Sequence, residues 1–280
     1  MSLDQQIDRL IKPLAEGLSD IVFYQVSVFG QGFPLIVLWL VTAAVFFTGY
    51  LGFINIRGFS KAISLVSGTS GKTNGSGEIS HFQALSTAIS GTVGVGNIGG
   101  VAVAISIGGP GAAFWLFMAG FLGMSTKFVE CTLGVKYRRE NLDGSVSGGP
   151  MYYLERYLLD RGFPKLGKLL GGFYALALVI GCFGIGNMFQ SNQAYVQVLS
   201  ISGGENSFFA DKGWLFGLLL ATAVAAVIIG GIRSIGNVAS KIVPFMAILY
   251  VFSAVIIIAM SAEHLIGAIG LIVSNAFESQ

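Results

Sequence analysis

An all-α polytopic membrane protein is the fold class that this sequence predicts, on three observations. Of its 280 residues, 54% are apolar and only 11% are charged, whereas a soluble domain carries about 25% charged residues. The apolar residues lie in long runs, and a helix needs about 20 of them to cross the roughly 30 Å of hydrocarbon in a bilayer. These runs are apolar on every face, as in residues 35–45, whereas the strands of a membrane barrel alternate.

Six runs are long enough to span a membrane. Each must be helical, because hydrocarbon offers the backbone no hydrogen-bond partner outside its own segment. A seventh apolar run reaches the end of the sequence, and we expect a single transmembrane domain over residues 1–280. The predicted spans are residues 34–54, 82–107, 110–135, 169–199, 213–232 and 240–262, followed by 265–280 as the start of a seventh.

The distribution of Lys and Arg predicts the orientation, because these residues concentrate in cytoplasmic loops. The loops after the first, third and fifth spans, with the start of the sixth, hold twelve of the sixteen, against three on the other side. We therefore expect residues 1–33 to form an amphipathic leader on the periplasmic side, with the N-terminus outside a bacterial or archaeal plasma membrane. The twelve are Arg57, Lys61, Lys72, Lys136, Arg138, Arg139, Arg156, Arg161, Lys165, Lys168, Arg233 and Lys241.

The predicted cytoplasmic loop at residues 136–168 is too long for a simple turn. Pro150 is a typical first residue of a helix, and apolar and charged positions follow it with helical spacing up to residue 160. The pattern predicts an amphipathic helix at the membrane surface, with its tyrosines at headgroup depth.

The second predicted span has an unusual composition at its centre. Residues 90–100 contain five glycines with a serine, a threonine and an asparagine. Each glycine costs about 1 kcal/mol inside a helix, so the cluster favours a break. Irregular backbone at that depth persists only where it lines a cavity or packs against protein. The alternative is that the glycines serve close helix packing, although packing motifs space small residues by four and these crowd together.

A break of this kind would offer two half-helix ends to a solute and an ion. N–H groups at the start of the second half attract a carboxylate, and carbonyls at the end of the first half coordinate a cation such as Na⁺. Residues 94–99 also fit G-x-G-x-x-G. A dinucleotide site needs that motif in a βαβ unit, so its place in an apolar run argues against nucleotide binding.

The fourth predicted span contains side-chain amides, including Asn187, Gln190 and Asn192. Burying an unpaired amide costs several kcal/mol, so these groups need partners or a polar path. Gln190 follows Asn187 by three residues and shares its helix face. Two interpretations remain open for Gln190: a side chain that faces the solute, and an interhelical hydrogen bond that serves packing.

The sequence contains no pattern that indicates an enzyme. Carboxylates are not paired at membrane depth, and Cys131 and Cys182 lie in apolar segments without metal-ligand spacing. We expect neither a catalytic residue nor a nucleic-acid partner.

Five stretches of the chain together resemble the alanine or glycine:cation symporter family. Their order and spacing agree with that family, and the resemblance covers nearly the whole chain. The stretches are residues 91–100 (GTVGVGNIGG), 108–115 (GGPGAAFW), 123–130 (GMSTKFVE), 148–153 (GGPMYY) and 183–188 (FGIGNM).

The resemblance implies a LeuT-like fold of the amino acid–polyamine–organocation type, with an inverted five-plus-five helix repeat. This chain would supply an extra N-terminal helix and the first repeat, and the run from residue 265 would begin the second repeat. The family then implies roles for particular residues. Main-chain carbonyls of Ser90 and Val93 would hold Na⁺, and the substrate site would comprise Thr92, Gly94, Val95, Gly96, Asn97 and Gln190.

The function that follows is Na⁺-coupled symport of a small neutral amino acid, alanine or glycine, by alternating access. Na⁺ would be a co-transported ion, and the partners would be the amino acid and the lipid bilayer. The alternative is a channel or a non-transporting membrane subunit in which the glycines serve packing.

Overall fold

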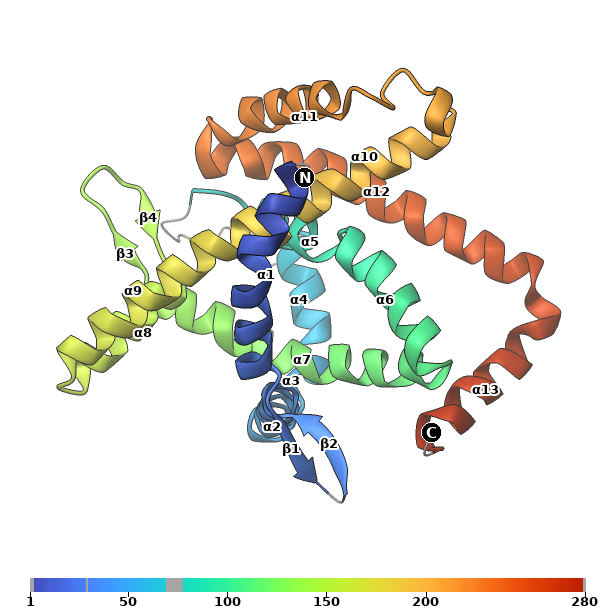
Figure 1. Ribbon diagram of the computed structural model, residues 1–280. Helices are drawn as coiled ribbons and strands as arrows, with labels where there is room; N and C mark the ends of the chain where they lie inside the picture. The colour runs from blue at the N-terminus through green and yellow to red at the C-terminus, as the bar shows by residue number, and fades with distance from the viewer. Residues whose placement is uncertain (1–2, 29, 69–77, 279–280) are drawn as a thin grey trace. The chain divides into compact units, whose positions relative to one another are not determined.

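The computed structural model describes residues 3–28, 30–68 and 78–278. Lys72, one of the basic residues used to predict orientation, lies outside them. The chain divides into two compact units, and Figure 1 labels their helices and strands. The first comprises Met1–Phe59 and Phe117–Val129, and the second comprises Ser60–Leu116 and Glu130–Gln280.

The first unit consists mainly of two helices joined by a small hairpin. The hairpin pairs Gln25 with Pro34 and Val28 with Gln31 in antiparallel register. The elements are α1 (Leu3–Val22), β1 (Gln25–Val28), β2 (Gln31–Pro34), α2 (Leu35–Tyr50), α3 (Ile54–Arg57) and the part of α7 (Gly111–Lys136) that belongs to this unit.

The second unit is helical apart from the hairpin of β3 and β4. It also contains a π-helix, η1, between two α-helices. The elements are α4 (Phe59–Val66), α5 (His81–Thr92), α6 (Val95–Gly108), the ends of α7, β3 (Arg139–Glu140), β4 (Val146–Ser147), α8 (Pro150–Asp160), α9 (Pro164–Gly181), η1 (Cys182–Phe189), α10 (Gln190–Ile201), η2 (Gly204–Asn206), α11 (Gly213–Ile228), α12 (Gly231–Met260), η3 (Ala262–His264) and α13 (Leu265–Phe277).

The prediction of a mostly helical protein is confirmed. Four helical stretches are long and apolar enough to cross a membrane, namely His81–Gly108, Gly111–Lys136, Pro164–Ile201 and Gly231–Met260. The shorter apolar helices are Leu35–Tyr50, Gly213–Ile228 and Ala262–Phe277. The two hairpins are additions that hydropathy did not predict.

One predicted loop is helical in the structure. Residues 232–240 separate two spans by hydropathy, but they form the first part of α12. The corner lies earlier, where Gly231 adopts a φ of +67°, a conformation that glycine accepts without a steric penalty. Polar residues at 233–241 lower the local hydropathy, but the helix continues through them.

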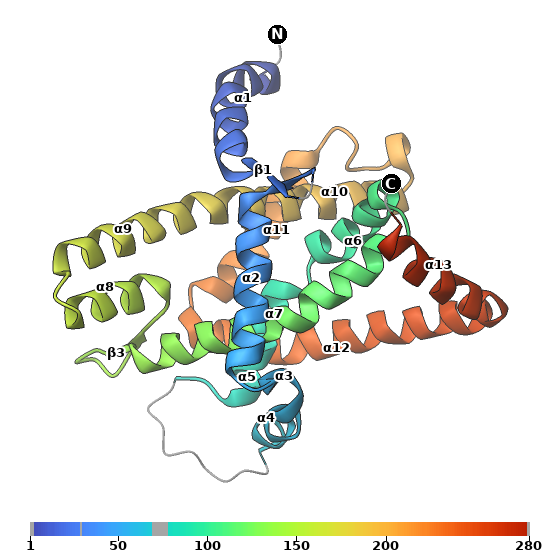
Figure 2. The ribbon, with the colours of Figure 1, turned by 90° about the horizontal axis from the view of Figure 1, so that it is seen from below.

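Glycines let the helices of the second unit approach one another. Helices α8 and α9 lie side by side (Figure 2). A Cβ on Gly167 would lie 2.9 Å from the carbonyl oxygen of Glu155, and one on Gly171 would lie 2.8 Å from that of Met151. Because real Cβ atoms do not come so close, these two positions require glycine.

The β3–β4 hairpin is ordered by local hydrogen bonds. The Asp143 carboxylate accepts a hydrogen bond from the Ser145 hydroxyl at 2.6 Å and from the Ser145 N–H at 3.0 Å. These bonds favour the charged form, so they lower the pKa of Asp143 below its ordinary value. Asn141 Nδ2 closes the turn by donating to the hydroxyls of Ser145 and Ser147 at 2.9 and 3.0 Å.

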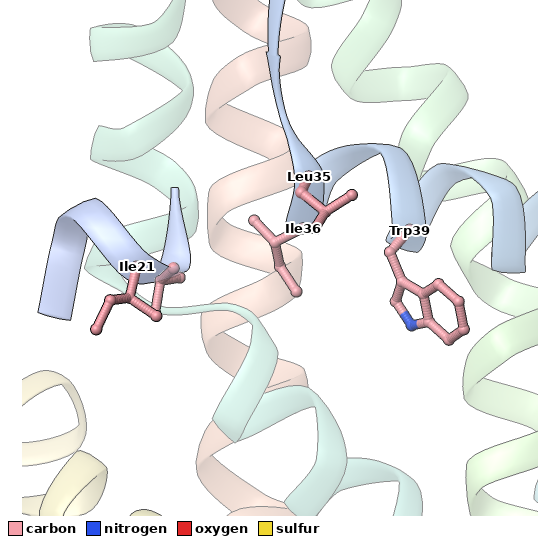
Figure 3. Close-up of a pocket in the computed structure, with 5 residues that line it drawn as sticks. Ile21, Leu35, Ile36 and Trp39 are labelled. Carbon is pink, nitrogen blue, oxygen red and sulfur yellow. The ribbon is translucent and has the colours of Figure 1, made fainter. Parts of the chain in front are cut away.

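An apolar pocket in the first unit lies where α1 ends and α2 begins (Figure 3). It has a volume of about 360 Å³ and is lined by Ile21, Val22, Leu35, Ile36 and Trp39. None of these side chains is charged, so none can form an ion pair with the carboxylate or the ammonium group of an amino acid. The pocket therefore suits hydrocarbon better than a polar solute.

The first unit buries a polar contact between α2 and α7. Thr48 Oγ1 lies 2.7 Å from the carbonyl oxygen of Ala44 and 3.0 Å from Ser125 Oγ. Thr48 is 2% exposed and Ser125 is fully buried. Among the described contacts, the buried Ser125 hydroxyl depends on Thr48 for its hydrogen bond, whereas Thr48 also bonds the Ala44 carbonyl in its own helix.

We predict that Thr48→Val lowers the free energy of unfolding by about 0.6–1 kcal/mol, because Ser125 then loses its interhelical partner. Thermal unfolding in detergent measures the change. Thr222→Val is the matched control, since the Thr222 hydroxyl is exposed and bonds only the Leu218 carbonyl in its own helix among the described contacts. Equal shifts in the two variants would contradict the prediction.

Candidate functional site

The candidate site lies where α5 ends and α6 begins, inside the second predicted span. Helix α5 ends at Thr92, and α6 begins at Val95. Gly94 is extended, with φ −127° and ψ 178°. The Gly94 carbonyl accepts hydrogen bonds from the N–H groups of Asn97 and Ile98 at 3.0 and 3.1 Å. These bonds begin a new helix instead of continuing α5.

The two helices differ at their N-termini. Helix α5 has a complete capping box, in which Ser80 Oγ accepts from the Gln83 N–H and the Gln83 side chain accepts from the Ser80 N–H. The residue at the corresponding position of α6 is Gly94, which has no side chain to act as a cap. The first N–H groups of α6, on Val95 and Gly96, therefore have no side-chain cap, and a helix N-terminus of this kind suits a negatively charged group.

The last turn of α5 presents hydroxyl oxygens. Ser90 Oγ donates to the Thr87 carbonyl at 2.7 Å, and Thr92 Oγ1 donates to the Ala88 carbonyl at 2.6 Å. Each hydroxyl uses its proton in that bond and keeps lone pairs that can accept. Both residues are exposed. Their oxygens, together with the main-chain carbonyls at the end of α5, have the chemistry that Na⁺ prefers.

Asn97 connects the two half-helices. Its Nδ2 donates to the carbonyl oxygen of Thr92, so the side chain of the first turn of α6 bonds the end of α5. Because the amide nitrogen is used in this way, the oxygen Oδ1 remains as an acceptor. Asn97 is exposed, and it thereby adds a polar group to the break.

Gln190 lies beside the break. A Cβ on Gly94 would be 3.6 Å from both Nε2 and Oε1 of Gln190, and a Cβ on Gly96 would be 4.0 Å from Nε2. The structure thus brings together Thr92, Gly94, Gly96, Asn97 and Gln190. Only ordinary van der Waals distances separate the glycine positions from the amide, so larger side chains there would fill the space beside it.

A π-helix precedes Gln190. Residues Cys182–Phe189 form η1, and α10 starts at Gln190. Single π-turns inside α-helices are frequent at functional sites, because they change the direction of the side chains that follow. Helical spacing in the sequence does not predict this element, although Gly181, Gly184 and Gly186 mark a stretch with low helix propensity.

Asn187, a second amide of this span, makes different contacts from Gln190. Asn187 Oδ1 accepts from the Ser191 hydroxyl at 3.1 Å. Asn187 also lines a separate, mostly apolar cavity of about 420 Å³ with Leu178, Val179, Cys182 and Phe183. Sequence spacing alone placed Asn187 and Gln190 on one helix face, and the π-helix alters that register.

Close packing does not account for the remaining glycines of the break within the described part of the chain. A Cβ added at Gly91, Gly99 or Gly100 would meet no atom within 4 Å. Gly94 and Gly96 border only the Gln190 amide. These contacts favour the interpretation in which the glycines open a space over the interpretation in which they close one.

Comparison with known proteins identifies the family. The sodium:alanine symporter family matches this chain over residues 17–280. The chain belongs to the sodium:alanine symporter family. This confirms the resemblance inferred from the five motifs.

Relatives within the family include the sodium/alanine symporter AgcS of Methanococcus maripaludis, which is 43% identical over 244 residues, covering 87% of this chain and 52% of AgcS. The probable sodium/glutamine symporter GlnT of Bacillus subtilis is 34% identical over 244 residues, covering 87% of this chain and 48% of GlnT. The chain spans about half the length of these relatives.

Membership has two direct consequences. The chain is a multi-pass membrane protein with bacterial and archaeal relatives, and its family consists of transporters rather than enzymes. In addition, among the residues that the structure describes, no group of three or more His, Cys, Asp or Glu side chains could hold a metal ion. The oxygens at the break are carbonyl, hydroxyl and amide oxygens, and they carry no formal charge.

We predict that Asn97→Ala accelerates hydrogen exchange at the backbone amides of residues 93–98, because the side-chain bond between α6 and α5 is lost. Loss of one such bond corresponds to about 1 kcal/mol, or roughly fivefold faster exchange. Mass spectrometry of the protein in detergent measures it.

Ser106→Ala is the control for Asn97→Ala, since the Ser106 hydroxyl bonds the Val103 carbonyl within α6. It should leave exchange at residues 93–98 unchanged. If Asn97→Ala also leaves it unchanged, Asn97 does not hold the two half-helices together.

Proposed function

We propose that this chain is the N-terminal half of a transporter that carries a small neutral amino acid, alanine or glycine, together with Na⁺. The observation that carries the proposal is the break between α5 and α6, whose uncapped N–H groups and hydroxyl oxygens lie beside the Gln190 amide. Membership of the family supports it, as does the relative AgcS, a sodium/alanine symporter.

In this proposal the two helix ends at the break bind ligand groups of opposite charge. The N–H groups of Val95 and Gly96, at the positive end of the α6 dipole, bind the amino-acid carboxylate. Main-chain carbonyls of Ser90 and Val93, at the negative end of α5, bind Na⁺. Thr92 and Asn97 line the site, Gly94 lets the backbone approach the solute, and Gln190 contacts it from α10.

Coupling follows from the proximity of the two ligands. If Na⁺ and the amino acid stabilise the same arrangement of α5 and α6, each raises the affinity for the other by the same factor. Transport by alternating access then requires that this arrangement can open to either side of the membrane. Because the break is built of short helix ends, small movements of α5 relative to α6 change both sites together.

The proposed architecture is the LeuT-like inverted repeat. In that arrangement α2 is the extra N-terminal helix, and α5 with α6 is the broken first helix of repeat one. Helix α13 is then the first half of the corresponding broken helix of repeat two. Helix α13 is apolar, and it follows the five spans assigned to repeat one, which supports this assignment. The rest of the solute and Na⁺ sites would come from the part of the relatives that this chain does not cover.

The proposed orientation places the N-terminus outside and the hairpin β3–β4, with α8, in the cytoplasm. Its support is the distribution of Lys and Arg between alternate loops. Helix α8 presents Tyr157 beneath the Arg161 guanidinium, 5.2 Å from the ring centroid. Aromatic and cationic side chains of this kind are typical of the headgroup region.

The rival proposal is a channel or a non-transporting subunit in which the glycines serve packing. It draws support from the close approaches at Gly167 and Gly171, where an added Cβ would lie within 3.0 Å of the backbone of α8, and from the tighter-than-usual 3.3 Å between a Cβ on Gly236 and Ile79 Cγ2. The glycines of the break make no such approach in the described structure, which is why we favour transport.

We predict that the full-length protein containing this chain accumulates radiolabelled alanine in proteoliposomes when Na⁺ is higher outside, and that unlabelled glycine competes. Uptake should fall at least tenfold when choline replaces Na⁺, because the cation site is then empty. Unlabelled glutamine is the specificity control, since the relative GlnT is a probable sodium/glutamine symporter. Uptake that does not depend on Na⁺ would contradict Na⁺ coupling. Stronger competition by glutamine than by glycine would indicate glutamine as the substrate.

We predict that Gly96→Leu abolishes alanine binding while the protein remains folded, because the added side chain fills the space beside the Gln190 amide. Gly100→Leu is the matched control. It lies one turn further along α6, where an added Cβ meets nothing within 4 Å. Binding of labelled alanine to purified protein, with monodispersity by size-exclusion chromatography, measures both. Equal affinity in the two variants would favour the packing alternative.

A further inference from the structure

Glu78 joins three separate segments of the second unit. Its Oε1 accepts a hydrogen bond from the N–H of Val146 in β4 at 3.0 Å. Its Oε2 lies 3.6 Å from Nε of Arg233 in the first turn of α12. Glu78 itself stands two residues before Ser80, the N-cap of α5. One carboxylate therefore connects the start of α5, the start of α12 and the β3–β4 hairpin.

The packing around Glu78 shows that α5 and α12 meet closely at this end. A Cβ on Gly236 would lie 3.3 Å from Ile79 Cγ2 and 3.5 Å from Gln83 Cβ. Gly236, Ala239 and Val243 are buried on one face of α12, and Ser86 is buried on α5. We call this contact between α5 and α12 the apolar seam. The Glu78 contacts lie at its edge, and the ion pair with Arg233 links the two helices.

The position of the carboxylate makes it more than a surface ion pair. The Glu78 side chain is 19% exposed, whereas that of Arg233 is 73% exposed. A partly buried carboxylate that accepts a backbone N–H makes a stronger bond than an exposed pair, because the charge assists the hydrogen bond. The hairpin that supplies the N–H is itself ordered by Asp143 and Asn141.

Helix α5 connects the region of Glu78 to the break. It has 12 residues, so the N-cap and the break lie about 18 Å apart along one rigid helix. The capping box at Ser80 and Gln83 keeps the first turn of α5 helical. A tilt at one end of such a helix moves the other end.

We propose that Glu78 is a positioning residue that holds α5 against α12, and that its release allows α5 to tilt and rearrange the break. This inference rests on the proposed transport function, because it assigns to α5 the movement that alternating access requires. The contacts of Glu78 stabilise the arrangement seen here. When they separate, the buried seam between α5 and α12 opens to solvent.

The experiment measures opening of that seam by the labelling rate of a buried cysteine. The full-length protein containing this chain carries Cys131→Ala, Cys182→Ala and the reporter substitution Ala239→Cys. N-ethylmaleimide, which crosses membranes, is the reagent, so the result does not depend on orientation.

Four variants test the two contacts of Glu78 separately. Glu78→Ala removes both, and we expect labelling to become about tenfold faster. Glu78→Gln keeps an oxygen for the Val146 N–H and removes only the charge, so we expect about threefold. Glu78→Arg places two guanidinium groups together, removes the acceptor for the Val146 N–H and should also accelerate labelling. The exchange Glu78→Arg with Arg233→Glu lacks the same acceptor but restores the ion pair, so its rate should fall below that of Glu78→Arg alone.

Glu263→Ala is the control, because Glu263 forms an exposed pair with His264 away from this seam, at 3.4 Å. It should leave the labelling rate unchanged. The proposal is overturned if Glu78→Ala labels no faster than this control, or if the charge exchange labels as fast as Glu78→Arg. Should Glu78→Ala fail size-exclusion chromatography, the near-isosteric Glu78→Gln carries the test. Labelling requires no transported solute, so failure here is separable from failure of the proposed function.

Discussion

Backbone hydrogen bonding inside hydrocarbon is the constraint on which the rest of this structure depends. A chain that crosses a bilayer must pair its N–H and C=O groups within its own helices. The break after Thr92 departs from that rule by leaving the first donors of α6 without a side-chain cap. The departure is compatible with a membrane only where those groups meet protein, water or a ligand. In the proposed transport function, the carried amino acid would be that ligand.

The site is formed by two irregular helices rather than by one. Helix α5 stops and α6 restarts, while the neighbouring span widens into a π-helix before Gln190. Each irregularity rests on glycine, because glycine tolerates interruption of a helix at low steric cost. Together they bring a side-chain amide to the side of Gly94. Neither irregularity alone would place a polar side chain beside uncapped N–H groups.

The two ends of α5 serve different purposes. Its start is held by a capping box and by the Glu78 contacts with α12 and the hairpin, whereas its end carries the hydroxyls and carbonyls of the candidate site. A helix held at one end and open at the other suits a moving part. The second half of the relatives, which this chain does not cover, would face the open end in the proposed fold.

The sequence by itself determined the helical membrane class, the weak point near residues 90–100 and the family, because hydropathy, glycine clusters and ordered motifs are local properties of the chain. It also drew attention to Gln190, since an amide within an apolar run needs a partner. Only the tertiary structure decided that Gln190, rather than Asn187, lies beside the break, because a π-helix changes the register that α-helical spacing assumes. The Glu78 contacts likewise could not be predicted from the sequence, because Val146 and Arg233 lie far from Glu78 along the chain and only folding brings them together.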